Sequence, residues 1–173
     1  MRALRAKLAR YEAPIGQLWF AYTDEGFFAV SLANREDFLA FLKSKGVKAS
    51  GEGSELPFGL EDRLNAYFSG ERVELTRAPI WFAWGTPFQK AVWRAIRRIP
   101  YGQTRSYSWL ARQVGRPRAV RAVGQAVKAN PLLLLVPCHR VVRADGSMGG
   151  FMPGLEVKKW LLRLEGALPE RAA

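Results

Sequence analysis

The sequence predicts an α/β (α+β) fold: a small N-terminal part with a sheet and helices, then a mainly helical C-terminal part that carries a helix-turn-helix. Two patterns predict it. Aromatic residues alternate with other residues early in the chain, as in strands, whereas apolar residues recur with helical spacing after residue 86. The 173 residues, 49% of them hydrophobic, suffice for a core and exclude a disordered chain. We place the two parts at residues 1–80 and 81–173.

Periodicity predicts the elements of the N-terminal part. Two alternating runs between Ile15 and Leu32 flank an acidic turn with a glycine, which is typical of a β-hairpin. Apolar residues three and four positions apart predict helices from Arg35 to Lys45 and from Leu60 to Phe68. Val47 to Pro57 is rich in Gly, Ser and Glu and is expected to be a loop, and Arg72 to Phe82 is expected to form a strand.

The C-terminal part opens with a clear helix start. Thr86 to Gln89 offers an N-cap, a proline at the first helical position and the glutamine of a capping box, and the apolar stripe that follows reaches Ile99. Ser106 can cap a short helix from Tyr107 to Val114, and a second helix is expected from about Ala119 to Ala129. Two short helices joined by a tight turn form a helix-turn-helix.

The positive charge is confined to the C-terminal part. Residues 1–80 hold 11 basic and 11 acidic side chains, whereas residues 81–173 hold 16 basic and 4 acidic ones. Lys90 to Arg143 contains 12 Lys or Arg and no Asp or Glu. A merely solvated surface normally mixes both signs, so this run predicts a basic face or channel that binds nucleic acid.

The cysteine and histidine counts limit the chemistry. The single cysteine, Cys138, excludes an internal disulfide, and with the single histidine, His139, it excludes a zinc site of several Cys and His ligands. We expect no metal and no cofactor. No stretch approaches the ~18 apolar residues of a membrane span, and Met1 to Arg10 lacks the apolar core of a signal peptide. We expect a cytoplasmic protein, or a nuclear one in a eukaryote, that does not bind membranes.

The second helix of the helix-turn-helix has few long side chains. Small residues would let its backbone lie close to a DNA groove, or would let two helices pack tightly in a core. Because long polar side chains that read base edges are mostly missing, we expect sequence-independent binding, with Arg121 able to enter the base stack. The residues expected to contact DNA are Arg118, Ala119, Arg121, Ala122, Gly124, Gln125 and Lys128.

Cys138 ends an apolar run that starts at Pro131. A lone cysteine is most often a small buried hydrophobic residue. Here His139 and Arg140 follow it directly, and we expect these neighbours to lower the pKa of the thiol and raise its thiolate fraction.

Several motifs around this cysteine resemble those of the O6-alkylguanine-DNA alkyltransferases, which reverse alkylation damage directly. Pro137 to Val141 reads Pro-Cys-His-Arg-Val, with Asn130-Pro131 before it and Gly149-Gly150 and the segment from Lys158 to Gly166 after it. The resemblance covers about Thr86 to Gly166.

The resemblance assigns a role to each matching residue. Cys138 would attack the alkyl carbon on guanine O6, His139 would deprotonate it through a water, and Glu165 would orient His139. Tyr107 would protonate or polarise the leaving guanine, and Asn130 would brace the active-site turn. The residues expected to contact the flipped base are Tyr107, Val141, Gly149, Gly150 and Met152.

The expected function is therefore a single-turnover alkyltransferase that flips the damaged nucleotide, places Arg121 in the gap and alkylates itself. Its partner would be double-stranded DNA with an alkylated guanine, bound by a monomer. Two other classes remain open. A non-enzymatic DNA-binding module would use Cys138 only in its core, and a Cys-His hydrolase would need an acyl substrate, turnover and an oxyanion hole.

Overall fold

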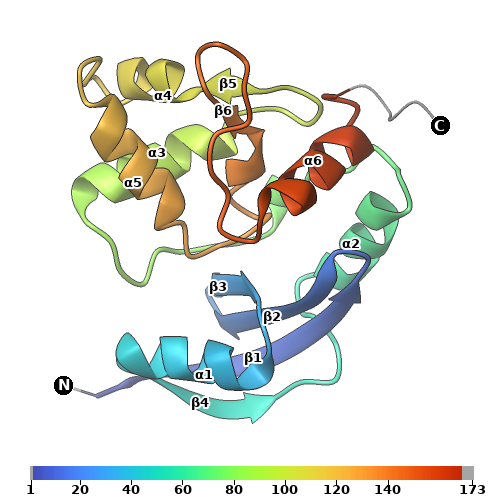
Figure 1. Ribbon diagram of the computed structural model, residues 1–173. Coiled ribbons are helices and arrows are strands. Elements are labelled where there is room, and N and C mark those ends of the chain that lie inside the picture. Colours follow the sequence, from blue (N-terminus) through green and yellow to red (C-terminus); the bar gives the residue numbers. More distant parts are fainter. Residues whose placement is uncertain (1, 169–173) are drawn as a thin grey trace.

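The computed structural model describes residues 2–168 and has a sheet region below a cluster of helices (Figure 1). The sheet has four strands in the order β3-β2-β1-β4. Its first three strands form an antiparallel meander, and β4 pairs in parallel with β1. The strands are β1 (Leu4–Ala13), β2 (Gly16–Thr23), β3 (Gly26–Leu32) and β4 (Val47–Glu52).

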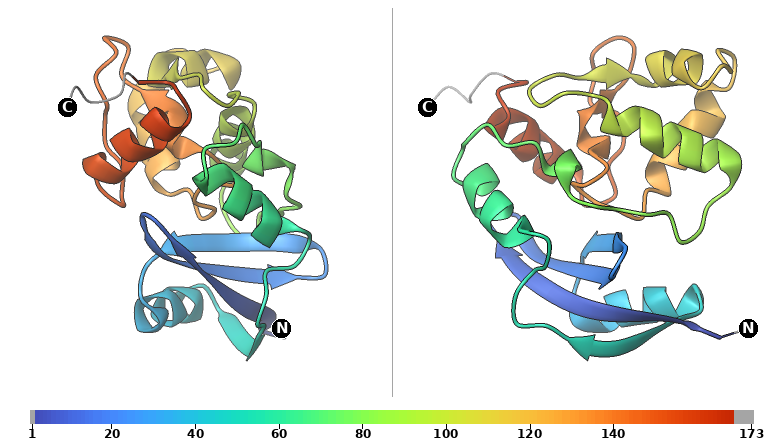
Figure 2. Two further views of the ribbon diagram at one scale, coloured as in Figure 1. Left: turned by 90° about the vertical axis from the view of Figure 1, so that its right-hand side faces the viewer. Right: turned by 180° about the vertical axis from the view of Figure 1, so that it is seen from behind.

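The two faces of the sheet belong to different cores because successive side chains of a strand point to opposite sides. Trp19 and Phe28 pack with Phe38 of helix α1 (Arg35–Ser44), which covers the face away from the other helices (Figure 2). Phe20 and Phe27 face the opposite way, into the main core that the sheet shares with the C-terminal helices. Helix α2 (Leu60–Phe68) also packs in this main core.

The predicted hairpin and both N-terminal helices are confirmed, but two expectations for this part are wrong and one strand was missed. Residues Val47–Glu52 form the edge strand β4, not a loop; five of its six side chains are exposed, so it lacks an apolar pattern. The segment from Arg72 to Phe82 forms no strand. It contains the 3-10 helix η1 (Leu75–Arg77) and touches β3 through a single bridge, Phe27 to Ile80. Strand β1 was not predicted, although Leu4, Ala6 and Leu8 alternate with basic residues.

The C-terminal part is mainly helical, as predicted. The capping box at Thr86 and the cap at Ser106 are both present, and the helix-turn-helix is formed by α4 and α5, which pack on each other and on α3. Its elements are α3 (Pro87–Arg97), β5 (Arg105–Ser106), α4 (Tyr107–Gln113), α5 (Val120–Lys128), the 3-10 helix η2 (Cys138–Arg140), β6 (Val141–Val142) and α6 (Leu155–Leu164).

The sheet edge continues into the segment that leads to the cysteine. Val30 of β3 donates its N–H to the carbonyl of Pro131 (2.8 Å) and accepts a hydrogen bond from the N–H of Leu133 (3.2 Å). Both parts thus share backbone pairing as well as a core, and the boundary at residue 80 stays a prediction. Within residues 2–168, no helix combines the length and apolar character needed to cross a bilayer.

Candidate active site

Cys138 lies at the start of η2, after a tight turn of buried residues. In this turn the N–H of Val136 donates to the carbonyl of Leu132 (2.8 Å), and Leu134 adopts a left-handed backbone with φ of 69°. A non-glycine residue in this region carries strain, which the surrounding structure must hold in place. The turn therefore fixes the position of the cysteine that follows it.

Asn130 ties the end of α5 to this turn. Its Nδ2 donates to the carbonyl of Val136 (2.9 Å) and to Sγ of Cys138 (3.2 Å), while its Oδ1 accepts from the N–H of Leu132 (2.9 Å). All three hydrogen bonds of one amide thus hold the segment that contains the thiol.

The expected cause of thiol activation is wrong. Burial raises the pKa of Cys138, whose side chain is 8% exposed, and the groups that oppose this shift are Asn130 and Lys158. His139 and Arg140 do not act on the thiol in this way because both side chains bind Glu165 instead. The unliganded protein therefore holds a protonated thiol, which needs a base in order to react.

A cavity of about 780 Å³ opens beside the thiol, between β3, α5 and the loop that follows β6. Nine of the residues singled out from the sequence line it, and Val30, Ser31 and Leu32 of β3 add a wall that the sequence did not indicate. The nine are Tyr107, Arg121, Gly124, Lys128, Asn130, Cys138, Gly149, Gly150 and Met152.

Tyr107 lines the cavity beside the loop that follows β6. A Cβ on Gly149 would lie 2.8 Å from the Tyr107 hydroxyl oxygen, and Gly149 has a positive φ of 67°, so only glycine lets the loop lie on this ring. Burial, together with the nearby Cys138, raises the pKa of Tyr107. The phenol therefore stays protonated and can donate a hydrogen bond into the cavity.

His139 and Glu165 lie behind the cysteine and do not line the cavity. His139 Nε2 is 2.7 Å from Glu165 Oε2, and both side chains are almost fully buried. Burial alone would raise the pKa of Glu165, but His139 and Arg140 together hold it well below its ordinary value. Because a carboxylate only accepts, Nε2 carries a proton, whereas Nδ1 has no hydrogen-bond partner among the described residues.

Arg140 completes a buried network, in keeping with a structural role. Its Nε donates to Glu165 Oε1 (2.8 Å), and its Nη1 donates to Glu74 Oε1 (2.9 Å) and to the carbonyl of Ile99 (2.8 Å). A further side chain of this network comes from α2: the Tyr67 hydroxyl donates to Glu165 Oε2 at 2.6 Å. Neither Tyr67 nor Glu74 was indicated by the sequence, because each lies far along the chain from its partners.

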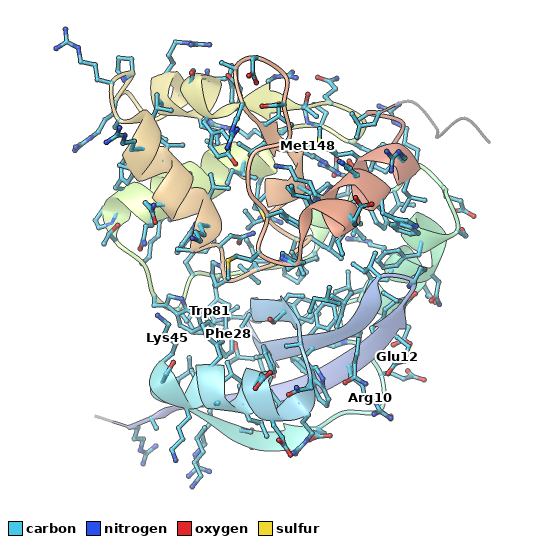
Figure 3. All side chains as sticks on the ribbon, in the orientation of Figure 1. Arg10, Glu12, Phe28, Lys45, Trp81 and Met148 are labelled. Carbon is cyan, nitrogen blue, oxygen red and sulfur yellow. The ribbon has the colours of Figure 1, made fainter. Side chains whose placement is uncertain are left out.

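Lys158 is a further residue that the sequence did not single out individually. Its fully buried Nζ donates to the carbonyls of Val141 (2.6 Å), Met148 and Gly150 (3.4 Å), and so ties α6 to the cavity loop, where Figure 3 labels Met148. Burial lowers the pKa of Lys158 to about 8. Val141, expected to contact the base, does not line the cavity: its side chain is buried and its carbonyl is occupied by Lys158.

The small residues of α5 face outward. Ala122 is exposed, and a Cβ placed on Gly124 would meet no atom within 4 Å, so these two residues are not small because of core packing. Ala126 is the exception, since it is buried and its carbonyl accepts from the indole N–H of Trp93 (2.8 Å). Four other residues that were predicted to contact DNA are also exposed: Arg118, Arg121, Gln125 and Lys128. Ala119 is half-buried.

The predicted basic face is present on the helix-turn-helix, although not all of the basic run belongs to it. Arg140 is buried, and Arg97 is partly buried, donating to the carbonyls of Leu135 (3.1 Å) and Ala78 (3.1 Å). Arg112 and Arg116 are exposed and extend the cationic surface of α5 onto α4 and the turn. Within residues 2–168, no three His, Cys, Asp or Glu side chains are grouped so that they could hold a metal ion.

Fold and site together define a helix-turn-helix protein that holds a buried thiol beside a cavity flanked by cationic side chains. Residues 7–82 match the family model of the 6-O-methylguanine DNA methyltransferase, ribonuclease-like domain. Residues 87–167 match the family model of the 6-O-methylguanine DNA methyltransferase, DNA binding domain. The chain belongs to the 6-O-methylguanine DNA methyltransferase family.

Relatives match over almost the whole chain. A methylated-DNA-protein-cysteine methyltransferase of Methanosarcina acetivorans is 41% identical over 162 residues, which cover 92% of this chain and 97% of the relative. One of Shigella flexneri is 40% identical over 173 residues, covering 97% and 98%. The crystal structure of Mycobacterium tuberculosis OGT in complex with DNA superimposes with a TM-score of 0.79 at 35% identity and covers 93% of both chains.

Proposed function

We propose that the protein repairs alkylated DNA directly, by moving the alkyl group of O6-alkylguanine, or of O4-alkylthymine as a further substrate, to the sulfur of its own Cys138. The observation that carries this proposal is the position of that thiol, held by Asn130 at a cavity beside the exposed cationic face of α5. The names of the full-length relatives support the activity. Since a thioether is stable in water, each molecule acts once.

The geometry supports a role for His139 as the base. In the neutral imidazole, its Nδ1 can take the thiol proton through a bridging water, while Glu165 stabilises the imidazolium that forms. The thiolate then attacks the alkyl carbon, an S–C bond forms and the C–O6 bond breaks. The guanine leaves as a neutral molecule because it takes up a proton from Tyr107. His139 then returns a proton to Tyr107, so the proton that left the thiol is balanced by the one gained by the guanine.

The DNA is bound through its shape and phosphates. Exposed small residues on α5 let the backbone lie close to a groove, and the surrounding arginines neutralise phosphates without reading sequence. The target nucleotide must leave the stack to reach the cavity, and Arg121, which lies at the rim, fills the gap. We further propose that a monomer acts on chromosomal DNA, in the cytoplasm or in the nucleus of a eukaryote.

Intact-protein mass spectrometry tests the proposed function. Equimolar protein and a duplex with one O6-methylguanine should give a mass increase of one methyl group per chain, located on Cys138 and absent in Cys138→Ala. DNA binding should survive that substitution because the thiol lies below the binding surface. Tight binding without any mass change would indicate a DNA-binding module, and continued turnover of an acyl substrate would indicate a hydrolase.

Arg121→Ala should slow alkyl transfer from a duplex more than from a single strand. The reason is that only a duplex leaves a gap in the base stack, and opening it costs a few kcal/mol that the inserted side chain partly offsets, so we expect a loss of roughly tenfold or more. Single-turnover rates on the two substrates check this. Arg112→Ala, on the neighbouring helix, is the control: it should weaken binding to both substrates alike. Equal slowing on both by Arg121→Ala would contradict the role in flipping.

A further inference from the structure

Glu165 receives more hydrogen bonds than a carboxylate that only orients a histidine would need. His139 and Arg140 both donate to it from η2, and Tyr67 donates from α2, which is 98 positions away in the sequence and belongs to the N-terminal part. Tyr67 is 0% exposed, and its hydroxyl lies 2.6 Å from Oε2, the oxygen that also binds His139. One carboxylate oxygen is thus shared between the proposed base and a tyrosine from the sheet-bearing part.

We propose that Tyr67 is a positioning residue for alkyl transfer: its hydroxyl fixes Oε2 of Glu165 against His139 and takes up part of the negative charge of that oxygen. The N-terminal part would thereby complete the active site without touching the substrate. This inference rests on the proposed function of Cys138 and His139.

The tyrosine is held rigidly enough for this role. Its ring packs edge-on against Phe68, with centroids 5.1 Å apart, and against Tyr101, with centroids 6.1 Å apart. Burial, and then the adjacent Glu165, raises the pKa of Tyr67 well above its ordinary value. The hydroxyl therefore remains a hydrogen-bond donor at neutral pH, and the two packed rings restrict its movement away from Oε2.

The other charged and titratable groups around Glu165 show what this donor changes. Arg140 binds both carboxylate oxygens and is itself balanced by Glu74 at 2.9 Å, while Tyr101 lies next to Tyr67 with Arg72 over its ring. Arg140 and the Tyr67 hydroxyl both donate to Oε2, the oxygen that also bonds His139, so together they hold this oxygen in one position facing the histidine.

Tyr67→Phe and Tyr101→Phe form a matched pair for the test. Each removes one hydroxyl from the same buried cluster, but the Tyr101 hydroxyl donates to the carbonyl of Leu164 (3.3 Å) and not to Glu165. Tyr67→Phe should lower the single-turnover rate constant about tenfold near neutral pH, since one charge-assisted hydrogen bond is lost. Tyr101→Phe should keep the wild-type rate.

A double-mutant cycle distinguishes an effect of Tyr67 through His139 from a general loss of rigidity in the protein. In the His139→Gln background, removing the Tyr67 hydroxyl should change the remaining rate by less than about twofold, because the residue through which it acts is gone. The same tenfold loss with and without His139, or identical behaviour of the two Tyr variants, would overturn the proposal. Denaturation midpoints ensure that rates are compared between folded proteins.

Failure of this inference is distinguishable from failure of the proposed function. If the wild-type protein gains no alkyl group, the proposed function fails and the role of Tyr67 with it. If wild-type Cys138 is alkylated while Tyr67→Phe matches the wild type in rate, only the role of Tyr67 is overturned.

Discussion

Arg140→Met is expected to lower the free energy of unfolding by about 3–5 kcal/mol, the range found when one partner of a buried ion pair is removed. The Arg140 side chain is 2% exposed and donates to Glu165 and to Glu74. Without it, the buried carboxylate of Glu165 keeps only His139 and Tyr67 as partners. Urea denaturation followed by tryptophan fluorescence measures this change.

Arg112→Met is the matched control, because it removes an exposed arginine from α4. Its stability should stay within about 0.5 kcal/mol of the wild type, as for most surface substitutions. A stability of Arg140→Met equal to that of this control would contradict the expected contribution of the buried ion pair between Arg140 and Glu165.

His139→Gln is expected to reduce the rate of alkyl transfer by about 10²–10⁴-fold, the usual contribution of a general base. The thiol is protonated at rest because its pKa is raised by burial, so the loss of the base leaves few thiolates. Affinity for unmodified duplex should be unchanged, since His139 is 1% exposed and lies away from the cavity. Rapid-quench kinetics with a labelled duplex measure the rate, and Cys138→Ala sets the background.

A rate close to that of the wild type would mean that another group takes the thiol proton. Lys158 is the group to test next, because it lies near Cys138 and its pKa is lowered to about 8. Such a result would remove His139 from the mechanism while leaving the self-alkylation of Cys138 intact.

The elements that the sequence predicted well are those whose signals are local. The hairpin β2–β3, the helices α1 and α2, and the capped helices α3 and α4 each have a periodic face or an end signal within their own residues. Strand β4 has neither: it is an exposed edge strand held by pairing with β1, so its Gly-rich, polar sequence resembles a loop.

The same distinction holds for the candidate site. The motif around Cys138 indicated the residues that gather at the cavity, because they lie on adjacent elements of one part of the chain. Tyr67 and Glu74 could not be identified in this way, since an isolated tyrosine or glutamate in the first eighty residues carries no mark of the distant carboxylate or guanidinium that it meets. The predicted effect on the thiol pKa was also wrong, because His139 and Arg140 follow Cys138 in sequence but direct their side chains to Glu165.

The backbone pairing of Val30 with Pro131 and Leu133 joins the sheet of the N-terminal part to the segment that leads to Cys138. Separating the two parts would expose these amide groups and break the core that both share, so we expect the two parts to unfold together. Heat or denaturant should therefore abolish activity in a single transition. No intermediate with a folded sheet and a disordered active-site segment should be populated. Because each molecule reacts only once, cooperative unfolding means that every folded molecule retains a complete active site.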